Sequence, residues 1–333
     1  MHKACIATAA LFLFLALVAS PTLAQQPETK ARPKAKAVAK EDGKAALLRE
    51  KLEIQTDVEY AKAGDVSLKL DVYKPKAASD KPRPCIVWIH GGGWQNGNKS
   101  SGAGRLAGFV ASGDFVGVSV GYRLTDVATF PAQVHDCKAA IRYIRANAEK
   151  LGIDPEKIGV WGSSAGGHLV SLLGTSGDVK EVEGVLGTTG VSSRVNCVVD
   201  FCGPSDFLLF GETAPGLNRP GQAVYKLFGG PTGENAAMAK QASPATHVTK
   251  DDPPFLVVHG TDDKTVPLSQ AERLYEALKK ADVDATFVKI EGGGHGIGGP
   301  AVDARVKDFF ARHLLGKDVT VSNEPIKQPA SKQ

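Results

Sequence analysis

The sequence predicts an α/β fold, in which a mainly parallel β-sheet is covered by helices on both of its faces. Short, continuous apolar runs recur along the middle of the chain, as in strands that are buried on both sides of a parallel sheet. Segments with a helical spacing of apolar residues separate these runs. A long segment with weak periodicity, residues 203–252, lies between two strong strand patterns and predicts an inserted cap.

The composition is that of a globular protein. The chain has 333 residues, of which 42% are hydrophobic and 23% are charged. These values exclude a mainly disordered, collagen-like or coiled-coil chain. The net charge of +4 is too small for a chain of this length to indicate nucleic-acid binding, so we expect no nucleic-acid partner.

Residues 1–24 have the three parts of a secretory signal peptide. A short basic start precedes an apolar run, and the small residues of Thr22-Leu23-Ala24 provide a cleavage site after Ala24. The alternative is an N-terminal membrane anchor, but the apolar run is shorter than the ~20 residues that a span requires. We therefore expect export to the periplasm or the extracellular space, with no stable membrane span after cleavage.

Residues 25–46 are predicted to form a flexible basic linker, because almost no large apolar side chain is present to be buried. The folded domain is expected over residues 47–316, and the polar residues 317–333 are predicted to be a flexible tail. Of five cysteines, Cys5 lies in the signal peptide. The sequence leaves the pairing of the other cysteines open, although we expect no essential disulfide. These are Cys85, Cys137, Cys197 and Cys202.

Each predicted element follows from its local pattern. Residues 66–73 alternate apolar and polar side chains, as in a half-exposed antiparallel strand. Continuous apolar runs predict further strands at 85–90, 115–120, 158–162, 197–201, 255–260 and 286–290. Helical patterns occur at 131–151, 168–173, 269–278 and 302–315, and the first of these ends at Gly152.

The strongest chemical signal is the G-x-S-x-G motif of residues 162–166. It follows the strand pattern IGVW and begins the helical pattern GGHLVSLL, which is the context expected of a nucleophile elbow. Small residues at both flanks allow a sharp turn that exposes the central serine. This pattern makes Ser164 the candidate nucleophile, because Ser163 lacks glycines at the corresponding positions.

A second motif, HGGGW at residues 90–94, directly follows the strand pattern CIVWI. Its glycines allow backbone N–H groups to point toward a ligand. Gly92 and Gly93, together with Ala165 after the nucleophile, are the candidate oxyanion-hole donors. A phosphate-binding loop is the competing interpretation, but neither G-x-G-x-x-G nor a G-K-[ST] ending is present. Trp94 and His168 are candidate pocket-lining residues.

Taken in order, HGGGW, GSSAG, HGTDDKTVP and GGGHG resemble motifs of the α/β-hydrolase superfamily. Within it, the chain resembles the esterase/lipase branch of feruloyl and acetylxylan esterases, with hormone-sensitive-lipase-like carboxylesterases nearby. The segment DCKAAIRYIRANAEKLGIDPEKIGVWGSSAGGH is similar to the same branch. The resemblance covers residues 54–315 and implies a serine hydrolase of the carboxylesterase type, without a cofactor.

The resemblance places the catalytic acid in G-x-x-D-x-x-V-P, which assigns Asp263. Asp262 and the more distant Asp206 are alternatives whose ordinary roles would be turn or capping residues. His295 is the best candidate base, because it lies in a glycine-rich loop between the last predicted strand and the last predicted helix. The order Ser164, Asp263, His295 matches the order of this fold.

The predicted reaction is hydrolysis of a small or carbohydrate-linked ester, of acetyl or feruloyl type, through an acyl-enzyme. No metal is expected, since no Cys/His cluster with zinc spacing is present. A prolyl-oligopeptidase-like peptidase and an arylformamidase are the alternatives among enzymes. A non-catalytic hydrolase-like binding module is the alternative from another class. The sequence does not indicate the acyl or alcohol specificity or the oligomeric state.

Overall fold

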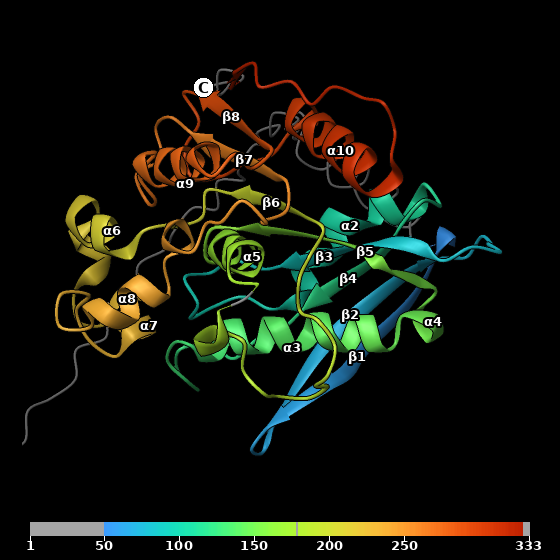
Figure 1. Ribbon diagram of the computed structural model, residues 1–333, viewed down its shortest axis with the longest axis horizontal. Helices are drawn as coiled ribbons and strands as arrows, with labels where there is room; N and C mark the ends of the chain where they lie inside the picture. The colour runs from blue at the N-terminus through green and yellow to red at the C-terminus, as the bar shows by residue number, and fades with distance from the viewer. Residues whose placement is uncertain (1–49, 178, 329–333) are drawn as a thin grey trace, which may run out of the picture. The chain divides into compact units, whose positions relative to one another are not determined.

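The computed structural model describes residues 50–177 and 179–328. The predicted signal peptide and linker lie outside these ranges. The described residues contain one sheet of nine strands in the order β1-β2-β4-β3-β5-β6-β7-β8-β9, with helices on both faces (Figure 1). The pairs β1–β2 and β2–β4 are antiparallel, and the remaining neighbours are parallel. The predicted α/β class with a mainly parallel sheet is therefore confirmed.

The strands are β1 (Leu52–Ala63), β2 (Val66–Pro75), β3 (Arg83–Ile89), β4 (Val116–Val120), β5 (Ile153–Ser163), β6 (Cys197–Phe201), β7 (Phe255–Gly260), β8 (Ala285–Glu291) and β9 (Ile326–Lys327). The predicted strand segments all fall within or overlap these. Strand β1 was not predicted, because most of its side chains are exposed and it has no apolar run.

The helices are α2 (Gly102–Ala111), α3 (Ala132–Ala146), α4 (Ala148–Leu151), α5 (Ala165–Thr175), α6 (Phe207–Thr213), α7 (Ala223–Phe228), α8 (Ala236–Gln241), α9 (Ser269–Lys280) and α10 (Pro300–Leu315). Short 3-10 helices lie at Lys99–Ser101, Lys180–Val182, Pro215–Asn218 and Pro244–Thr246. Helix α2 was not predicted, because three glycines interrupt the helical spacing of its apolar residues.

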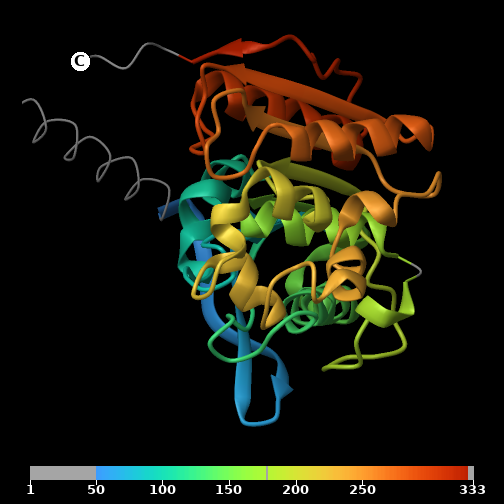
Figure 2. The same ribbon diagram turned by 90° about the vertical axis from the view of Figure 1, so that its left-hand side faces the viewer.

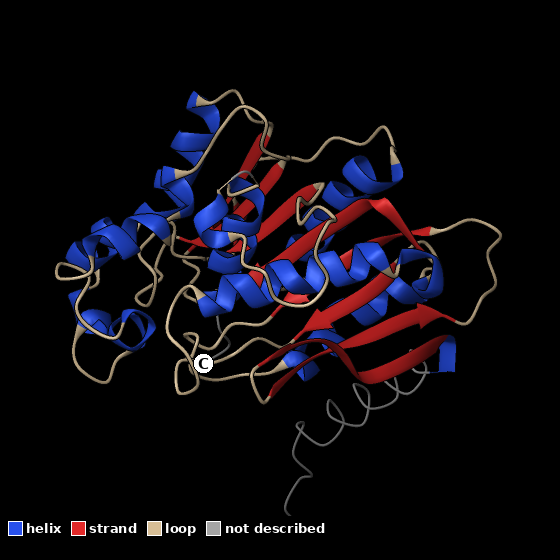
Figure 3. Ribbon diagram, turned by 60° about the horizontal axis from the view of Figure 1, so that its bottom comes forward, coloured by secondary structure: helices blue, strands red, loops and turns tan. Residues whose placement is uncertain are grey.

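Figure 3 shows the strands as one sheet (red) with helices (blue) packed along it. Two clusters of buried apolar side chains form layers between these helices and the sheet. Buried side chains of α3, α5 and α9 belong to the layer on one face. Buried side chains of α2 and α10 belong to the layer on the other face, together with Trp88 and Trp161. Burial of this apolar surface is the main favourable contribution to folding.

The segment between β6 and β7, predicted as a cap, contains α6, α7 and α8. These helices are grouped beyond the ends of the central strands (Figures 1 and 2). They are short, which explains why the segment showed weak periodicity. Phe207, Phe210, Val224, Leu227 and Phe228 are buried and attach them to the α3/α5 layer.

The prediction of a flexible tail is wrong for residues 317–328. Val321 is buried in the layer of α2 and α10. Ile326 and Lys327 form β9, which pairs in parallel with β8 at the edge of the sheet. The physical reason is that β9 pairs with backbone groups of β8 that would otherwise be unpaired at this edge, while Ile326 packs against the layer of α2 and α10.

Among the described residues, no helix has the length and apolar character that a membrane crossing requires.

Candidate active site

Ser164 lies in the sharp turn that joins β5 to α5. Its backbone has φ 57° and ψ −120°, a conformation that costs free energy for a residue with a side chain. Two close contacts of the chain impose it. A Cβ on Gly162 would lie 2.2 Å from the Gly166 carbonyl oxygen, and a Cβ on Gly166 would lie 2.1 Å from the Ile89 carbonyl oxygen. Glycine is therefore required at both flanks, and the turn presents Ser164 at the carboxyl end of the sheet.

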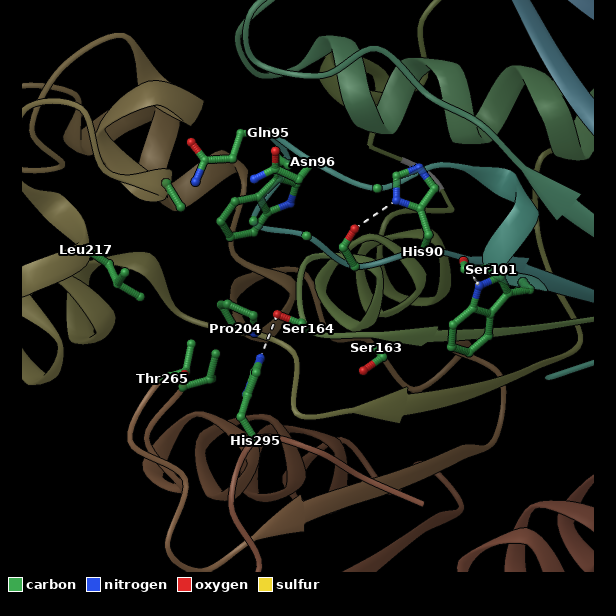
Figure 4. Close-up of a pocket in the computed structure, with 18 of the residues that line it drawn as sticks. His90, Gln95, Asn96, Ser101, Ser163, Ser164, Pro204, Leu217, Thr265 and His295 are labelled. Atoms are coloured by element: carbon green, nitrogen blue, oxygen red, sulfur yellow. Dashed lines mark hydrogen bonds between the residues drawn. The ribbon is translucent and has the colours of Figure 1, made fainter. Parts of the chain in front are cut away.

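The structure brings Ser164, His295 and Asp263 into one hydrogen-bonded chain. His295 Nε2 lies 2.9 Å from Ser164 Oγ (Figure 4). On the other side of the ring, His295 Nδ1 lies 2.7 Å from Asp263 Oδ2. His295 comes from the loop between β8 and α10, and Asp263 from the turn after β7. The Asp263 side chain is fully buried, whereas 28% of the His295 side chain is exposed.

The geometry determines the proton positions. An ionised carboxylate only accepts hydrogen bonds, so the proton facing Asp263 must lie on His295 Nδ1. The other ring nitrogen, Nε2, then has a free lone pair and accepts the hydrogen bond from the Ser164 hydroxyl. This tautomer is the one that a general base next to a serine requires.

Asp263 is held in its ionised form. Burial on its own would raise the pKa of this carboxyl, but hydrogen bonds from His259 and His295 outweigh it and hold the pKa well below its usual range. The other carboxylate oxygen, Oδ1, accepts from the backbone N–H groups of Thr265 at 2.8 Å and Val266 at 2.9 Å. The two imidazoles and the two backbone N–H groups therefore keep the carboxylate ionised and hold its orientation.

His259 contacts Asp263, and this contact was not predicted from the sequence. It ends β7 and is fully buried, as expected of a structural histidine. Its Nε2 lies 2.8 Å from the Val266 carbonyl oxygen and 3.3 Å from Asp263 Oδ2. Since both of these atoms are acceptors, Nε2 carries the proton and donates. A histidine four residues before the candidate acid was the only sequence signal of this contact.

The two alternative acids lie elsewhere. Asp262 is exposed, and its carboxylate accepts from the neighbouring Thr261 hydroxyl at 3.2 Å. Asp206 caps α6 by accepting from the N–H groups of Leu208 and Leu209, and it also pairs with Arg273. Each therefore has the local role that the sequence offered as its alternative.

The predicted oxyanion-hole groups lie beside Ser164. Gly92 has φ 110° and Gly93 has φ 60°, which is the left-handed region that favours glycine. The N–H groups of Gly92, Gly93 and Ala165 donate to no partner among the described residues. The preceding His90 supports this loop, since its ring stacks on Tyr122 with 4.3 Å between the centroids.

A pocket of about 630 Å³ opens at Ser164 and His295. Trp94 lines it, as predicted, but His168 does not. His168 lies one turn into α5 and points into the core, where its ring packs edge-on against Trp94 and Phe207. Its predicted pocket-lining role is therefore wrong. The His168 side chain instead packs against Trp94, which lines the pocket.

The hydrogen bonds of His168 define its charge state. Nδ1 accepts from the Trp94 indole N–H at 3.1 Å, and Nε2 donates to the Ala242 carbonyl oxygen at 2.8 Å. Burial lowers the pKa of this imidazole to about 4, so it is neutral near pH 7. The neutral ring thus connects the HGGGW loop to the end of the cap segment.

Cys202 lies close to Asp263 and His295, and one ligand atom from each of the three lies within 4.8 Å of the others. Such spacing would suit a metal ion. However, the carboxylate and the imidazole are hydrogen-bonded to each other, and burial raises the pKa of the Cys202 thiol. The three groups therefore do not offer a metal ion a set of free, deprotonated ligands.

The fold and the serine turn define the α/β-hydrolase superfamily, and comparison with known proteins gives the family. The BD-FAE family model matches residues 70–278, and the chain belongs to that family.

Its relatives and structural neighbours are esterases. The esterase LipC of Mycobacterium tuberculosis is 30% identical over 70% of this chain and 57% of its own length. The probable carboxylic ester hydrolase LipM of the same organism is 31% identical over 75% of this chain and 58% of its own length. The chain thus spans little more than half the length of these curated relatives.

Among solved structures, a truncated carbohydrate esterase from gut microbiota is 33% identical, with a TM-score of 0.72. That match covers 79% of this chain and 96% of the other. Thermogutta terrifontis esterase 2, solved with bound propionate, is 30% identical with a TM-score of 0.64 and covers 78% of this chain and 93% of its own.

Proposed function

We propose that the chain is an exported serine carboxylic-ester hydrolase that acts on small or carbohydrate-linked esters of acetyl or feruloyl type. One observation carries this proposal. The hydrogen-bonded chain Ser164–His295–Asp263 faces a pocket, beside backbone N–H groups that have no partner among the described residues. This is the arrangement of groups that acyl transfer requires.

In the proposed mechanism, His295 Nε2 takes the proton of the Ser164 hydroxyl as its oxygen attacks the ester carbonyl carbon. The charge that develops on the carbonyl oxygen is stabilised by the N–H groups of Gly92, Gly93 and Ala165. Asp263 keeps the imidazole in the reactive tautomer and stabilises its protonated form. His295 then protonates the leaving alcohol, and water attacks the acyl-enzyme with His295 as the base.

Similarity to carbohydrate esterases supports the substrate class. Besides the gut-microbiota enzyme, a bifunctional GH43-CE protein of Bacteroides eggerthii is 35% identical, with a TM-score of 0.70. Bound propionate and butyrate in Thermogutta terrifontis esterase 2 favour short acyl groups.

A panel of substrates tests this proposal. The panel contains acetyl, butyryl, longer-chain and feruloyl esters together with acetylated xylan, and we expect the purified protein to prefer acetyl or feruloyl esters and to release acetate from the xylan. Activity on acetylated xylan and feruloyl esters that is no better than on a simple short-chain ester would count against a polysaccharide substrate. Ser164→Ala is expected to lower kcat by at least about a thousandfold, with an unchanged circular dichroism spectrum. Turnover near the wild-type level by folded Ser164→Ala would refute the serine mechanism. Cleavage of prolyl peptides or N-formylkynurenine in preference to every ester would favour the peptidase or the formamidase.

Export is proposed from the sequence of residues 1–24 alone. Expression of the full chain in a bacterial host, followed by fractionation and N-terminal sequencing, tests it. We expect a product that begins at Gln25 in the periplasm or medium. A full-length product that stays in the cytosol would refute export without affecting the proposed chemistry.

A further inference from the structure

The pocket has two chemically different ends. Phe210, Leu217 and Ala223 are apolar lining residues that come from the cap segment. Trp88, Ser163 and Arg105 of α2 also line the pocket; Arg105 lies 5.3 Å from the ring of Trp88, whose indole N–H donates to Ser101 Oγ at 3.0 Å. In Figure 4, Leu217 lies on one side of Ser164, and Ser163 and Ser101 lie on the other. A substrate bound across Ser164 therefore extends toward both ends.

Among the described residues, Arg105 has no acidic ion-pair partner. None of the ion pairs between these residues involves it, and its one hydrogen bond to a described residue runs from Nη2 to the Ile297 carbonyl oxygen at 3.2 Å. Burial lowers the pKa of Arg105 and the negative charge of Asp303 partly opposes this shift, but Asp303 forms no ion pair with Arg105 among the described residues. Since a guanidinium has five N–H donors, most of them have no partner among the described residues.

The surroundings of Arg105 position its guanidinium without neutralising it. The group lies over the rings of Trp88 at 5.3 Å, Trp161 at 5.6 Å and Phe201 at 5.9 Å. Aromatic faces attract a cation and limit its movement but leave its edge donors available. Burial lowers the pKa of Arg105, although a guanidinium remains charged at neutral pH.

No Asp or Glu is present among the described residues that line the pocket. A neutral ester that fills this pocket would further desolvate Arg105 and supply no counter-charge, which costs free energy. A carboxylate at this end would instead form a charge-assisted and geometrically matched contact with the guanidinium.

We infer that Arg105 binds a carboxylate of the substrate, so that the preferred esters carry an acidic group. This inference rests on the proposed function and specifies its substrate class. Two kinds of ester fit. In one, the acyl part carries the carboxylate, as in a half-ester of a dicarboxylic acid. In the other, the alcohol part bears a carboxylate, as an acylated saccharide that contains a uronic acid does.

Two matched substrate pairs test the inference. On the acyl side, 4-nitrophenyl hydrogen succinate is compared with 4-nitrophenyl butyrate, which has the same number of acyl carbons. On the alcohol side, 3-acetoxybenzoate is compared with 3-acetoxybenzamide. In at least one pair we expect the charged ester to have the higher kcat/KM. Absence of any such preference in both pairs would overturn the inference.

Variants of Arg105 identify the origin of the preference. Arg105→Gln is expected to lower kcat/KM for the preferred charged ester by about ten- to a hundredfold and to leave its neutral partner nearly unchanged. Arg105→Lys, which retains the charge, should keep part of the preference. Arg312→Gln is the matched control, because Arg312 pairs with Asp284 next to the start of β8, away from the pocket.

The competing role for Arg105 is to tether the loop of His295 through the Ile297 carbonyl oxygen. Loss of a tether would lower kcat/KM equally for both members of each pair, and this result would overturn the inference. If no ester were hydrolysed at all, the proposed function would fail. The inference is then tested by calorimetric titration of 4-nitrophenyl hydrogen succinate. Weaker binding to Arg105→Gln supports it, and equal binding refutes it.

Discussion

Nε2 of His259 lies 3.3 Å from Oδ2 of Asp263, the same oxygen that accepts the hydrogen bond from His295 at 2.7 Å. A second, fully buried imidazole thus contacts the carboxylate that orients the candidate base. The Val266 carbonyl oxygen holds this ring in place at 2.8 Å. We expect His259 to act as a positioning residue, because it acts on the reaction through Asp263.

His259→Gln is expected to lower kcat by about tenfold, with KM within about twofold, because the loss concerns the orientation of Asp263 rather than substrate binding. Steady-state kinetics on one short-chain ester measures both constants. His313→Gln on α10 serves as the control, since His313 lies close to Asp284 and not to the pocket. A change in KM alone would contradict the positioning role.

Replacement of the acid distinguishes two neighbouring aspartates. Asp263→Asn retains the shape of the side chain but lets its amide donate to His295 Nδ1, so the ring proton lies on Nε2 and this nitrogen cannot accept the hydrogen bond from Ser164. We expect kcat to fall by about ten-thousandfold. Asp262→Asn should retain wild-type kcat, because Asp262 is exposed and has only a local contact. Equal losses in both variants would contradict the assignment of Asp263.

His168 makes stability depend on pH. Burial holds its folded-state pKa at about 4, below the value of about 6.5 in the unfolded chain. As the pH falls through this interval, the unfolded chain binds a proton that the folded protein does not, so stability is lost. Between about pH 7.5 and about pH 4.5 this group should cost about 2–3 kcal/mol of the free energy of unfolding.

Urea unfolding of wild type and His168→Gln at both pH values measures this loss. The variant should lose less stability on acidification than the wild type. Asp200 acts in the opposite direction, because burial raises its pKa to about 6 and its protonation favours the folded state below that value. It is present in both proteins and cancels in the comparison. Identical pH dependence in the two proteins would contradict the role of His168.

The cysteines are expected to resist modification. Cys85, Cys137, Cys197 and Cys202 are free and buried, and burial raises the pKa of each thiol. Since the thiolate is the reactive form, iodoacetamide at pH 8 should label none of them in the folded protein and all of them after denaturation. Peptide mass spectrometry locates the labels. Rapid labelling of Cys202 in the native state would contradict its burial beside His295.

Motifs and strand patterns predicted the parts of the site that depend on local sequence. Ser164 could be found because a strand, a glycine-flanked turn and a helix follow one another along the chain. His295 could be found because it lies in a glycine-rich loop between the last predicted strand and the last predicted helix. Asp263 was assigned through the family resemblance, which places the acid in the motif after the strand pattern FLVVHG.

The rest depends on contacts between distant segments. Arg105 reaches the pocket from α2, whose glycines hide its helical pattern, and it contacts Ile297 from the other end of the chain. His168 has the spacing of a lining residue, but the direction of its side chain is set by packing against Trp94 and Phe207. Strand β9 has two residues in an otherwise mainly polar segment, and its position depends on pairing with β8 and on the packing of Ile326 against the layer of α2 and α10.

The close approach of Gly166 to the Ile89 carbonyl oxygen joins the two parts of the chain that carry the candidate oxyanion-hole N–H groups. Ile89 directly precedes the loop of Gly92 and Gly93, and Gly166 directly follows Ala165. The backbones touch, so the spacing between the two sets of N–H groups is fixed by hard contact and not by side chains. We therefore expect substitutions in the cap segment to change the shape and selectivity of the pocket without moving the N–H groups that would stabilise the transition state in the proposed mechanism.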